Sequence, residues 1–376
     1  MNSLVIQRID RIEMETVRLK LASPFETSFS VQRDREALLL KVNSEGVVGW
    51  GECVAGLGPF YSYETNETVR HIVRDYLIPM LASALPATVG EVVAKFDRVR
   101  GHHMAKAMVE NALLDLAARM QGVPLWQFIG GKPRKIMSGI SIGIQPEAER
   151  LLETIGRAVE KRYGRIKLKI KKGRDVEVLE KVRKRFPEIR LMADANSDYS
   201  LDDGEHLKKL DAFRLMMIEQ PLGHDDIYQH SLLQRNLQTP ICLDESILSL
   251  DDARTAVELQ SCRVINIKQG RVGGILNSAK IEEFCRTNGI PVWSGGMLET
   301  GIGRSFNIHL QTLPGFVLPG DTSETSRYFA EDIVEPEVTL DEEGMIAIPA
   351  GPGTGVTVLD DRLKKYRISS DVLLPG

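Results

Sequence analysis

Residues 165–170 read RIKLKI, and four more short apolar runs follow at a regular interval along the chain. They are RLMADAN (190–196), LMMIEQ (215–220), PICLDES (240–246) and VINIKQG (264–270). Each run favours a β-strand, and the stretches between them have the length and amphipathic pattern of a helix. This alternation predicts repeated βα units with parallel strands.

Three further runs of the same kind extend the series on both sides. MSGISIGI (137–144) precedes it, and PVWSGG (291–296) and FVLPGD (316–321) follow it. Eight parallel strands predict an α/β fold built on a closed (β/α) barrel of the TIM type. Active sites of such barrels lie at the carboxyl ends of the strands.

The flanking regions have a different character. Residues 4–20, 35–43 and 46–54 alternate apolar and polar side chains, which predicts an antiparallel sheet. A helical pattern over residues 105–121 follows and stops at Gly122-Val123-Pro124. We therefore expect an α+β domain at residues 1–130, the barrel at 131–325, and a C-terminal segment at 326–376 that packs back on the N-terminal domain.

Composition favours small-molecule chemistry. The 376 residues suit a barrel of roughly 250 residues with a smaller companion domain. The net charge of −4 gives no general reason to expect binding to nucleic acid or to an anionic membrane. The chain has no long uncharged apolar run and no basic N-terminal segment followed by one, so we expect a cytoplasmic protein. Its four scattered cysteines are expected to be buried, reduced thiols.

Charged residues end five successive predicted strands, where burying an unpaired charge is expensive. Their spacings are 194 − 169 = 25, 219 − 194 = 25, 244 − 219 = 25 and 268 − 244 = 24. The residues are Lys169, Asp194, Glu219, Asp244 and Lys268. If consecutive strands are neighbours, all five side chains meet at the barrel mouth.

The three carboxylates of this series predict a site for a hard cation. An all-oxygen set of Asp194, Glu219 and Asp244 suits Mg²⁺, with Mn²⁺ able to take its place, better than Zn²⁺. As an alternative for single members, one or two of them could be N-caps of the helices that follow the strands.

The lysines indicate the reaction type. Lys167 and Lys169 are two residues apart, so both point to one face of their strand, and Lys268 faces the carboxylates from the opposite side. Removal of a proton next to a carboxylate fits this arrangement, because Mg²⁺ stabilises the enediolate and a desolvated lysine near a cation has a lowered pKa. Lys167 either tunes the pKa of Lys169 or neutralises the carboxylates. A solvated basic rim is expected at Lys161, Arg162, Lys171 and Lys172.

The strand ends carry the motifs KLKIKKG, ADAN, IEQPL, CLDES, INIKQGRVGG and WSGGMLETGIGR. These motifs resemble those of the muconate-lactonising subgroup of the enolase superfamily, and the last two resemble its o-succinylbenzoate synthase and N-succinylamino-acid racemase branch. Further matches are GECVA (51–55), GPFYSYE (58–64), the helix AKAMVENALLDLAAR and PGDTSETSRYF (319–329). The resemblance therefore covers most of the chain.

This resemblance implies an enolase-type modified barrel whose α+β domain is a capping domain, with loops near 20–30 and 51–61 closing over the substrate. It implies Mg²⁺ on the three carboxylates and an acid/base pair of Lys169 and Lys268. The synthase reaction of the family dehydrates 2-succinyl-6-hydroxy-2,4-cyclohexadiene-1-carboxylate in menaquinone synthesis, and the racemase exchanges the α-proton of N-succinylamino acids. The family also implies a homo-oligomer, a dimer or larger.

The resemblance further implies contacts with the small-molecule carboxylate substrate. In the barrel they fall on Lys167, Ser141, Asn196, Gly295, Gly296 and Met297, and in the lid on Phe25, Phe60 and Tyr61. Local alternatives exist for several of them. Ser141 could bind only backbone, the two glycines could serve only a tight turn, and the aromatic residues could only pack the small domain.

The leading hypothesis is a synthase that also racemises N-succinylamino acids, with the racemase as its main activity as the alternative. Both reactions need the same lysine pair. A dipeptide epimerase is disfavoured, because the segment after the eighth run reads Gly-Asp321-Thr-Ser and lacks the expected Asp-x-Asp. A non-catalytic scaffold is also disfavoured, because it gains nothing from converging charges that cost desolvation.

Overall fold

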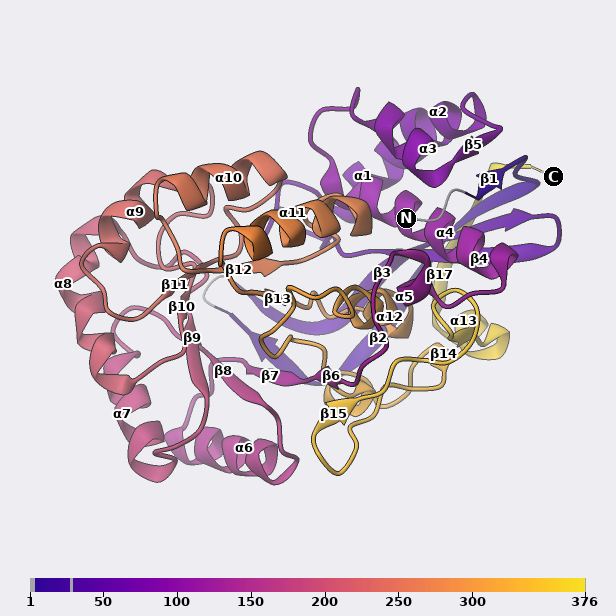
Figure 1. Ribbon diagram of the computed structural model, residues 1–376. Coiled ribbons are helices and arrows are strands. Elements are labelled where there is room, and N and C mark those ends of the chain that lie inside the picture. Colours follow the sequence, from indigo (N-terminus) through magenta and orange to yellow (C-terminus); the bar gives the residue numbers. More distant parts are fainter. Residues whose placement is uncertain (1–3, 28–29, 376) are drawn as a thin grey trace.

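The barrel is present in the computed structural model, which describes residues 4–27 and 30–375. Seven parallel strands pair in the order β13-β12-β11-β10-β9-β8-β7, in the centre of Figure 1. Their bounds are β7 (Gly139–Ile142), β8 (Arg165–Lys169), β9 (Leu191–Asp194), β10 (Ile218–Glu219), β11 (Ile241–Leu243), β12 (Val264–Ile267) and β13 (Val292–Ser294).

The eighth predicted strand is wrong in detail. Residues 316–321 form single bridges in place of a regular strand, to β13 at Phe316 and to the chain before β7 at Gly320. Pro319 explains the difference, because it has no N–H to donate and it restricts the residue before it, so a ladder cannot continue. The segment still lies between the first and last paired strands and connects them.

Side chains alternate across the barrel wall as the sequence predicts. Ile166, Leu168 and Ile170 of the β8 segment face outward and belong to the main hydrophobic core. A separate small cluster fills the barrel interior and consists of Met192, Met217, Cys242, Val264 and Trp293. Asp194, Glu219 and Asp244 each lie two residues after a member of this cluster, toward the carboxyl ends of the strands, so the site rests on a packed apolar floor.

Helices cover the outer side of the strands (Figure 1). Amphipathic patterns explain them, as in α6, where Leu151, Ile155 and Ala158 are the buried residues. The barrel helices are α6 (Ala148–Glu160), α7 (Val176–Arg185), α8 (Gly204–Leu207), α9 (Tyr228–Gln234), α10 (Leu250–Glu258), α11 (Ile275–Thr287) and α12 (Gly301–Leu310).

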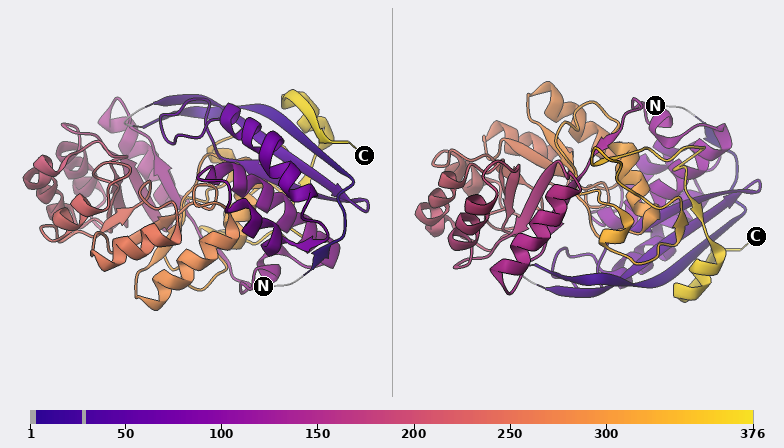
Figure 2. Two further views of the ribbon diagram at one scale, coloured as in Figure 1. Left: turned by 90° about the horizontal axis from the view of Figure 1, so that it is seen from above. Right: turned by 90° about the horizontal axis from the view of Figure 1, so that it is seen from below.

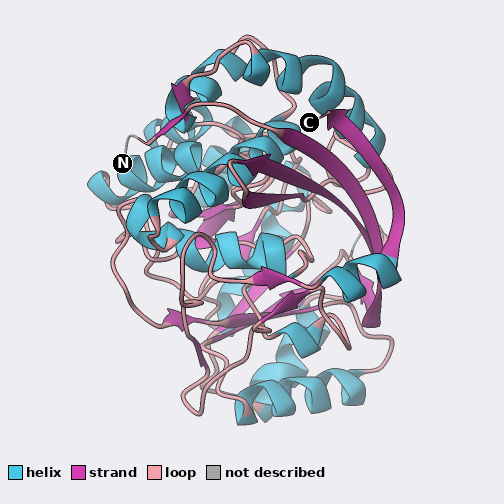
Figure 3. Ribbon diagram, turned by 90° about the vertical axis from the view of Figure 1, so that its right-hand side faces the viewer, coloured by secondary structure: helices cyan, strands magenta, loops and turns pink. Residues whose placement is uncertain are grey.

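A four-stranded antiparallel sheet in the order β17-β2-β3-β4 forms the second part of the molecule. Its long curved strands are seen from the side in Figure 3, and in Figure 2 they extend over the barrel strands. The bounds are β2 (Arg11–Glu26), β3 (Val31–Ser44), β4 (Val47–Cys53) and β17 (Arg367–Leu374). The C-terminal strand therefore pairs with the N-terminal sheet.

Two details of this sheet differ from the sequence-based prediction. The run 4–20 is two elements, because β1 (Val5–Ile6) pairs separately with β5 (Ala87–Thr88). Strands β2 and β3 also extend well past the predicted ends. The turn between β3 and β4 falls where the predicted strands 35–43 and 46–54 meet, at Glu45 (φ 53°) and Gly46 (φ 78°), the paired positive φ angles of a tight hairpin.

The remaining helices lie in the N-terminal region and in the C-terminal tail. The helices are α1 (Asn66–Ile72), α2 (Ile78–Ala82), α3 (Val89–Phe96), α4 (His103–Gln121), α5 (Leu125–Phe128) and α13 (Asp360–Tyr366). The two-residue strands of the tail form two antiparallel pairs, one with a strand that precedes the barrel and one within the tail itself. These pairs are β6 (Ile136–Met137) with β15 (Met345–Ile346), and β14 (Val334–Glu335) with β16 (Thr357–Val358).

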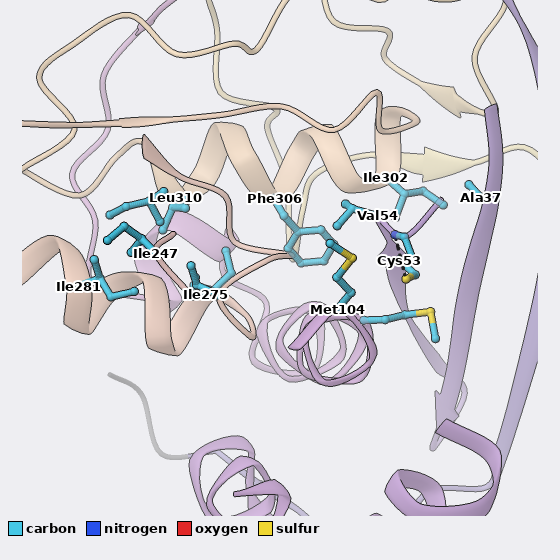
Figure 4. Packing of buried hydrophobic residues seen from close by; sticks show 14 of the residues in the cluster. Ala37, Cys53, Val54, Met104, Ile247, Ile275, Ile281, Ile302, Phe306 and Leu310 are labelled. Atoms are coloured by element: carbon cyan, nitrogen blue, oxygen red, sulfur yellow. Dashed lines mark hydrogen bonds between the residues drawn. The ribbon is translucent and has the colours of Figure 1, made fainter. Parts of the chain in front are cut away.

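Helix α4 is the predicted helix of residues 105–121, and it ends as expected at a left-handed Gly122 (φ 71°). It is buried between the N-terminal sheet and the barrel. Its Glu110 carboxylate accepts a hydrogen bond from the Leu276 N–H of α11 at 2.9 Å. Figure 4 shows Met104 of α4 beside Phe306 of α12, so apolar packing and buried hydrogen bonds both hold the two parts together.

Two further observations concern the cysteines and the lengths of the apolar helices. All four cysteines are buried and free, as predicted. No helix in the described part of the chain is both long enough and apolar enough to cross a membrane.

Glu52 of β4 is a second buried link between the parts. Its carboxylate accepts hydrogen bonds from Thr300 N (2.9 Å), Thr300 Oγ1 (2.6 Å) and Gly303 N (2.8 Å), at the start of α12. A side chain from the cap thus satisfies N–H groups that a helix leaves unpaired. Burial raises the pKa of Glu52 from 4.5 to about 7.

This raised pKa predicts a pH-dependent stability. Folded protein holds the Glu52 proton up to about pH 7, whereas the unfolded chain loses it near 4.5, so this contribution to stability falls as pH rises between the two values. Glu52→Gln removes the titration. The free energy of unfolding of wild type minus that of the variant, measured by urea titration, should therefore fall from about pH 5 to about pH 7 and stay flat above it.

The control is Glu67→Gln, at a side chain that is 84% exposed, which should show no such change. A difference between wild type and Glu52→Gln that stays constant over this pH range would contradict the assignment.

Candidate active site

The five periodic charges converge at the barrel mouth as the sequence predicts. Lys169 lies opposite Asp194 in the β8–β9 pairing, and Asp194 lies opposite Glu219 in the β9–β10 pairing. Asp244 comes two residues after Cys242, which is the partner of Glu219. This step of two residues follows from the stagger of strands in a closed barrel, and it keeps all the side chains on the inner face.

The two lysines occupy opposite edges of the carboxylate row. Strands β9, β10 and β11 separate β8, which carries Lys169, from β12, which precedes Lys268. Lys169 Nζ is 2.5 Å from an Asp194 oxygen, and Lys268 Nζ is 2.7 Å from an Asp244 oxygen. Each ammonium therefore contacts one end of the row.

Lys167 is enclosed by carboxylates on three sides. Its Nζ lies 2.5 Å from Asp321, 3.0 Å from Glu219 and 3.2 Å from Asp194. Burial works against its charged form, yet Asp321, Glu219 and Asp194 together raise the pKa of Lys167 well above its ordinary value. Of the two roles that the sequence left open, neutralising the carboxylates is the one that fits these contacts.

Arg165 completes this buried network beneath the site. It pairs with Asp321 at 2.5 Å, and its guanidinium lies 4.6 Å from the centre of the Trp293 ring. A Cβ at Gly139 would lie 2.4 Å from the guanidinium, so the first barrel strand needs a glycine there. Arg165 and Lys167 share the Asp321 carboxylate, and they lower its pKa although burial raises it.

Lys268 also contacts the capping domain. Its Nζ lies 2.8 Å from the Tyr61 hydroxyl and 4.7 Å from the centre of that ring, and Arg271 pairs with the same Asp244 carboxylate. Burial lowers the pKa of Lys268, but the nearby Asp244 carboxylate outweighs burial and raises it. The lowered lysine pKa expected beside a bound Mg²⁺ stays a prediction.

Lys169 has a different environment. It donates to Asn196 Oδ1 at 2.6 Å in addition to its contact with Asp194. Asn196 in turn donates to Glu245 at 2.9 Å, and it adopts a left-handed backbone (φ 43°) that lets its N–H reach Asp194. The Asn196 side chain thus fixes the ammonium from the side away from the carboxylate row.

The donor set fits a hard divalent cation. Like-charge repulsion is evident at Glu219, where burial and the neighbouring Asp194 raise the pKa well above its ordinary value. Two buried oxygens beside the row, Asn266 Oδ1 and Glu245 Oε2, lack hydrogen-bond partners. In the described residues no three Asp, Glu, His or Cys side chains form a ready-made metal site, because the carboxylate oxygens instead contact lysine and arginine.

A pocket of about 480 Å³ opens above the lysines. Lys169, Asn196 and Lys268 line its base, and residues 25–36 and 54–64 of the capping domain line its sides, although residues 28–29 lie outside the described part of the chain. The β2 strand ends over the barrel, where Ile144 N donates to the Glu26 carbonyl at 3.1 Å. The expected lid therefore contacts the barrel directly.

The predicted substrate-binding residues divide into two groups. The pocket is lined by Phe25, Phe60, Tyr61, Asn196, Gly296 and Met297. The others are not in its lining and are Lys167, Ser141 and Gly295. Ser141 is buried in the barrel wall with its hydroxyl unpaired.

The Gly295–Met297 segment shows why its sequence is constrained. A Cβ at Gly295 would come within 2.7 Å of the Lys268 side chain, so this glycine makes room for the lysine. The Met297 N–H donates to Glu299 at 2.8 Å, so this backbone donor has its hydrogen-bond partner within the protein.

Sequence reasoning missed several residues of the site. Asn266 bridges Glu219 and Asp244 at 2.8 and 3.0 Å, and strand alternation could have found it, because it lies two residues before Lys268. Arg271 stands three residues after Lys268 and carried no comparable signal.

Asp321 offers a direct test of the buried network. Asp321→Asn keeps the size of the side chain but leaves Arg165 without a carboxylate partner and Lys167 with one fewer. Removing one partner of a buried ion pair costs about 3–5 kcal/mol, so urea unfolding should show a loss of that order.

Glu177→Gln serves as the control, because the Lys181–Glu177 pair is exposed (50% and 74%) and should change stability by less than about 0.5 kcal/mol. Equal effects of the two substitutions would contradict the proposed charge balance.

The fold and the site together define a barrel protein of the enolase type. The chain matches the family model described as enolase C-terminal domain-like over residues 150–362. It also matches the mandelate racemase / muconate lactonizing enzyme N-terminal domain over residues 11–130. The chain belongs to the mandelate racemase / muconate lactonizing enzyme family of the enolase superfamily.

Proteins similar to this chain include synthases and racemases. An o-succinylbenzoate synthase of Geobacillus kaustophilus is 48% identical over 359 residues, which cover 95% of this chain and 96% of that protein. An N-succinylamino acid racemase of Thermus thermophilus is 47% identical over 352 residues, covering 93% and 94%. The crystal structure of an enolase-superfamily member from Listeria innocua superposes with a TM-score of 0.94 at 41% identity, covering 98% of this chain and 99% of that one.

Proposed function

We propose that the protein is an o-succinylbenzoate synthase that dehydrates 2-succinyl-6-hydroxy-2,4-cyclohexadiene-1-carboxylate in menaquinone synthesis. The observation that carries the proposal is the placement of Lys169 and Lys268 at opposite edges of a buried carboxylate row, under one pocket. Near-full-length similarity to a synthase supports the choice of substrate.

In this proposal Lys169 is the proton-transfer group. It removes the proton next to the substrate carboxylate and returns it to the departing hydroxide, which leaves as water. Asn196 orients Lys169 through the 2.6 Å contact, so that the side-chain nitrogen stays at the pocket base, where it accepts the proton as a neutral amine. Lys268 remains a cation beside the developing enediolate, because Asp244 and the face of the Tyr61 ring favour its charged form.

Asp194, Glu219 and Asp244 are the proposed holders of Mg²⁺. When bound there, the metal would polarise the substrate carboxylate and offset most of the negative charge of the three ligands. Lys167 and Asn266 keep the row in place from below, because both contact Glu219. The capping residues Phe25, Phe60 and Tyr61 line the pocket and give it aromatic walls.

Racemisation of N-succinylamino acids is the second candidate. Two lysines on opposite sides of one substrate carbon are what proton removal from one face and return to the other require. The 47% identity to a named racemase favours it as well. Both reactions use the same lysine pair and the same pocket, so one site can perform both.

A comparison of kcat/KM for the two substrates tests the proposal. With Mg²⁺ present, we expect both to turn over and kcat/KM to be higher for the cyclohexadiene carboxylate, because catalytic preference reflects binding of the transition state. Steady-state kinetics on the two substrates, side by side, gives this ratio. A higher kcat/KM for N-succinylamino acids would make racemisation the main activity, and turnover of neither substrate would refute the proposal.

The metal assignment predicts weaker Mg²⁺ binding when a ligand is neutralised. Asp244→Asn should raise the Kd for Mg²⁺ by about tenfold or more, measured by calorimetry without substrate. Asp225→Asn, at an exposed aspartate, is the control and should leave the Kd unchanged. An unaltered Kd in the Asp244 variant would remove that residue from the ligand set.

The proposal also includes the location of the protein and its assembly. Buried free thiols support a cytoplasmic protein, because reducing compartments keep cysteines unpaired. A homo-oligomer of two or more copies stays a prediction.

A further inference from the structure

A second cavity, of about 320 Å³, lies outside the barrel. One wall is helix α6, which runs along the outer side of β7 and β8 in Figure 1, and the opposite wall is the β2 segment 22–24 with Arg327. None of the residues that line it lines the pocket above the lysines. We call it the outer cavity.

Cationic side chains dominate the lining of the outer cavity. Helix α6 and the residue after its end contribute Arg150, Arg157 and Lys161, with spacings of seven and four residues that place them on one face of the helix. Arg327 contributes a fourth cation from the other wall, and Glu324 is the one acidic residue of the described lining.

Most of this positive charge has no acidic partner. Lys161 pairs with Glu324, but no ion pair involves Arg150, Arg157 or Arg327 in the described residues. Three guanidinium groups that share one hollow repel one another, and a bound anion would relieve that repulsion. Arg150 and Arg157 are exposed and Arg327 is half-buried, so an anion can reach all three guanidinium groups from solvent.

Arg327 is already held in position to receive a ligand. One of its terminal nitrogens donates to the Ser141 carbonyl of β7 at 3.0 Å, and the other lies 3.5 Å from Ser23 Oγ of β2. Its Nε is shielded from solvent and has no hydrogen-bond partner. A buried donor without an acceptor costs free energy, and a bound anion would supply the acceptor.

We propose that the outer cavity binds a small organic or inorganic polyanion through Arg150, Arg157 and Arg327. Arg150 and Arg157 start roughly 10 Å apart along the helix axis, so the ligand carries acidic groups at two ends. Arginine binds both carboxylate and phosphate in this way, so the shared chemistry is an anion of at least two charges, either a polycarboxylate or a polyphosphate. This site is independent of the reaction proposed above.

Calorimetry on the full chain tests the proposal, with citrate and pyrophosphate as the two probes. Titrations in metal-free buffer at constant ionic strength keep non-specific screening equal. At least one probe should bind wild type, and the one that binds tells a polycarboxylate site from a polyphosphate site. The double variant Arg150→Gln, Arg157→Gln should bind that probe at least about tenfold more weakly, because two charge-assisted contacts are lost.

Arg235→Gln is the matched control, because Arg235 is an exposed arginine that lines neither pocket, and it should bind like wild type. Lys169→Ala should also bind like wild type, because the anion does not occupy the pocket above the lysines. The proposal is overturned if neither probe binds, if the double variant binds as tightly as wild type, or if Lys169→Ala alone abolishes binding.

Discussion

Three carboxylates buried side by side at the barrel mouth are the constraint on which the rest of the structure depends. Such a row repels itself, and burial makes the repulsion stronger. Cations on three sides offset it, with Lys169 at one edge, Lys268 at the other and Lys167 below. The arrangement that balances the charge is also the one that places two ammonium groups under the pocket.

Much of the surrounding architecture supports this balance. Asp321 and Arg165 extend it downward to the apolar floor, where Trp293 packs against the cations. The capping domain reaches the row from above, because Tyr61 contacts Lys268. Glu52 and α4 hold that domain on the barrel with buried hydrogen bonds. Stability and the geometry of the site therefore depend on the same contacts.

The local periodicities of the sequence predicted the barrel and the carboxylate row, because strand alternation and a 25-residue repeat are visible along the chain. Contacts between distant segments carried no such signal. Pairing of Asp321 with Lys167 joins residues 321 − 167 = 154 positions apart, and the Tyr61 contact joins two domains. Pro319 interrupted the eighth strand, and the rise in the pKa of Lys268 depends on its contact with Asp244 of another strand end.

The central claim is that Lys169 and Lys268 lie on opposite faces of one substrate carbon, which both proposed reactions share, and exchange of the α-proton in D₂O tests it most directly. Each enantiomer of an N-succinylamino acid would be incubated separately with Lys169→Ala and with Lys268→Ala, and deuterium uptake followed by NMR. The account predicts that each variant loses racemisation, that one variant exchanges only one enantiomer, and that the other variant exchanges only its mirror image. Exchange of both enantiomers by either variant, or of the same one by both, would contradict it.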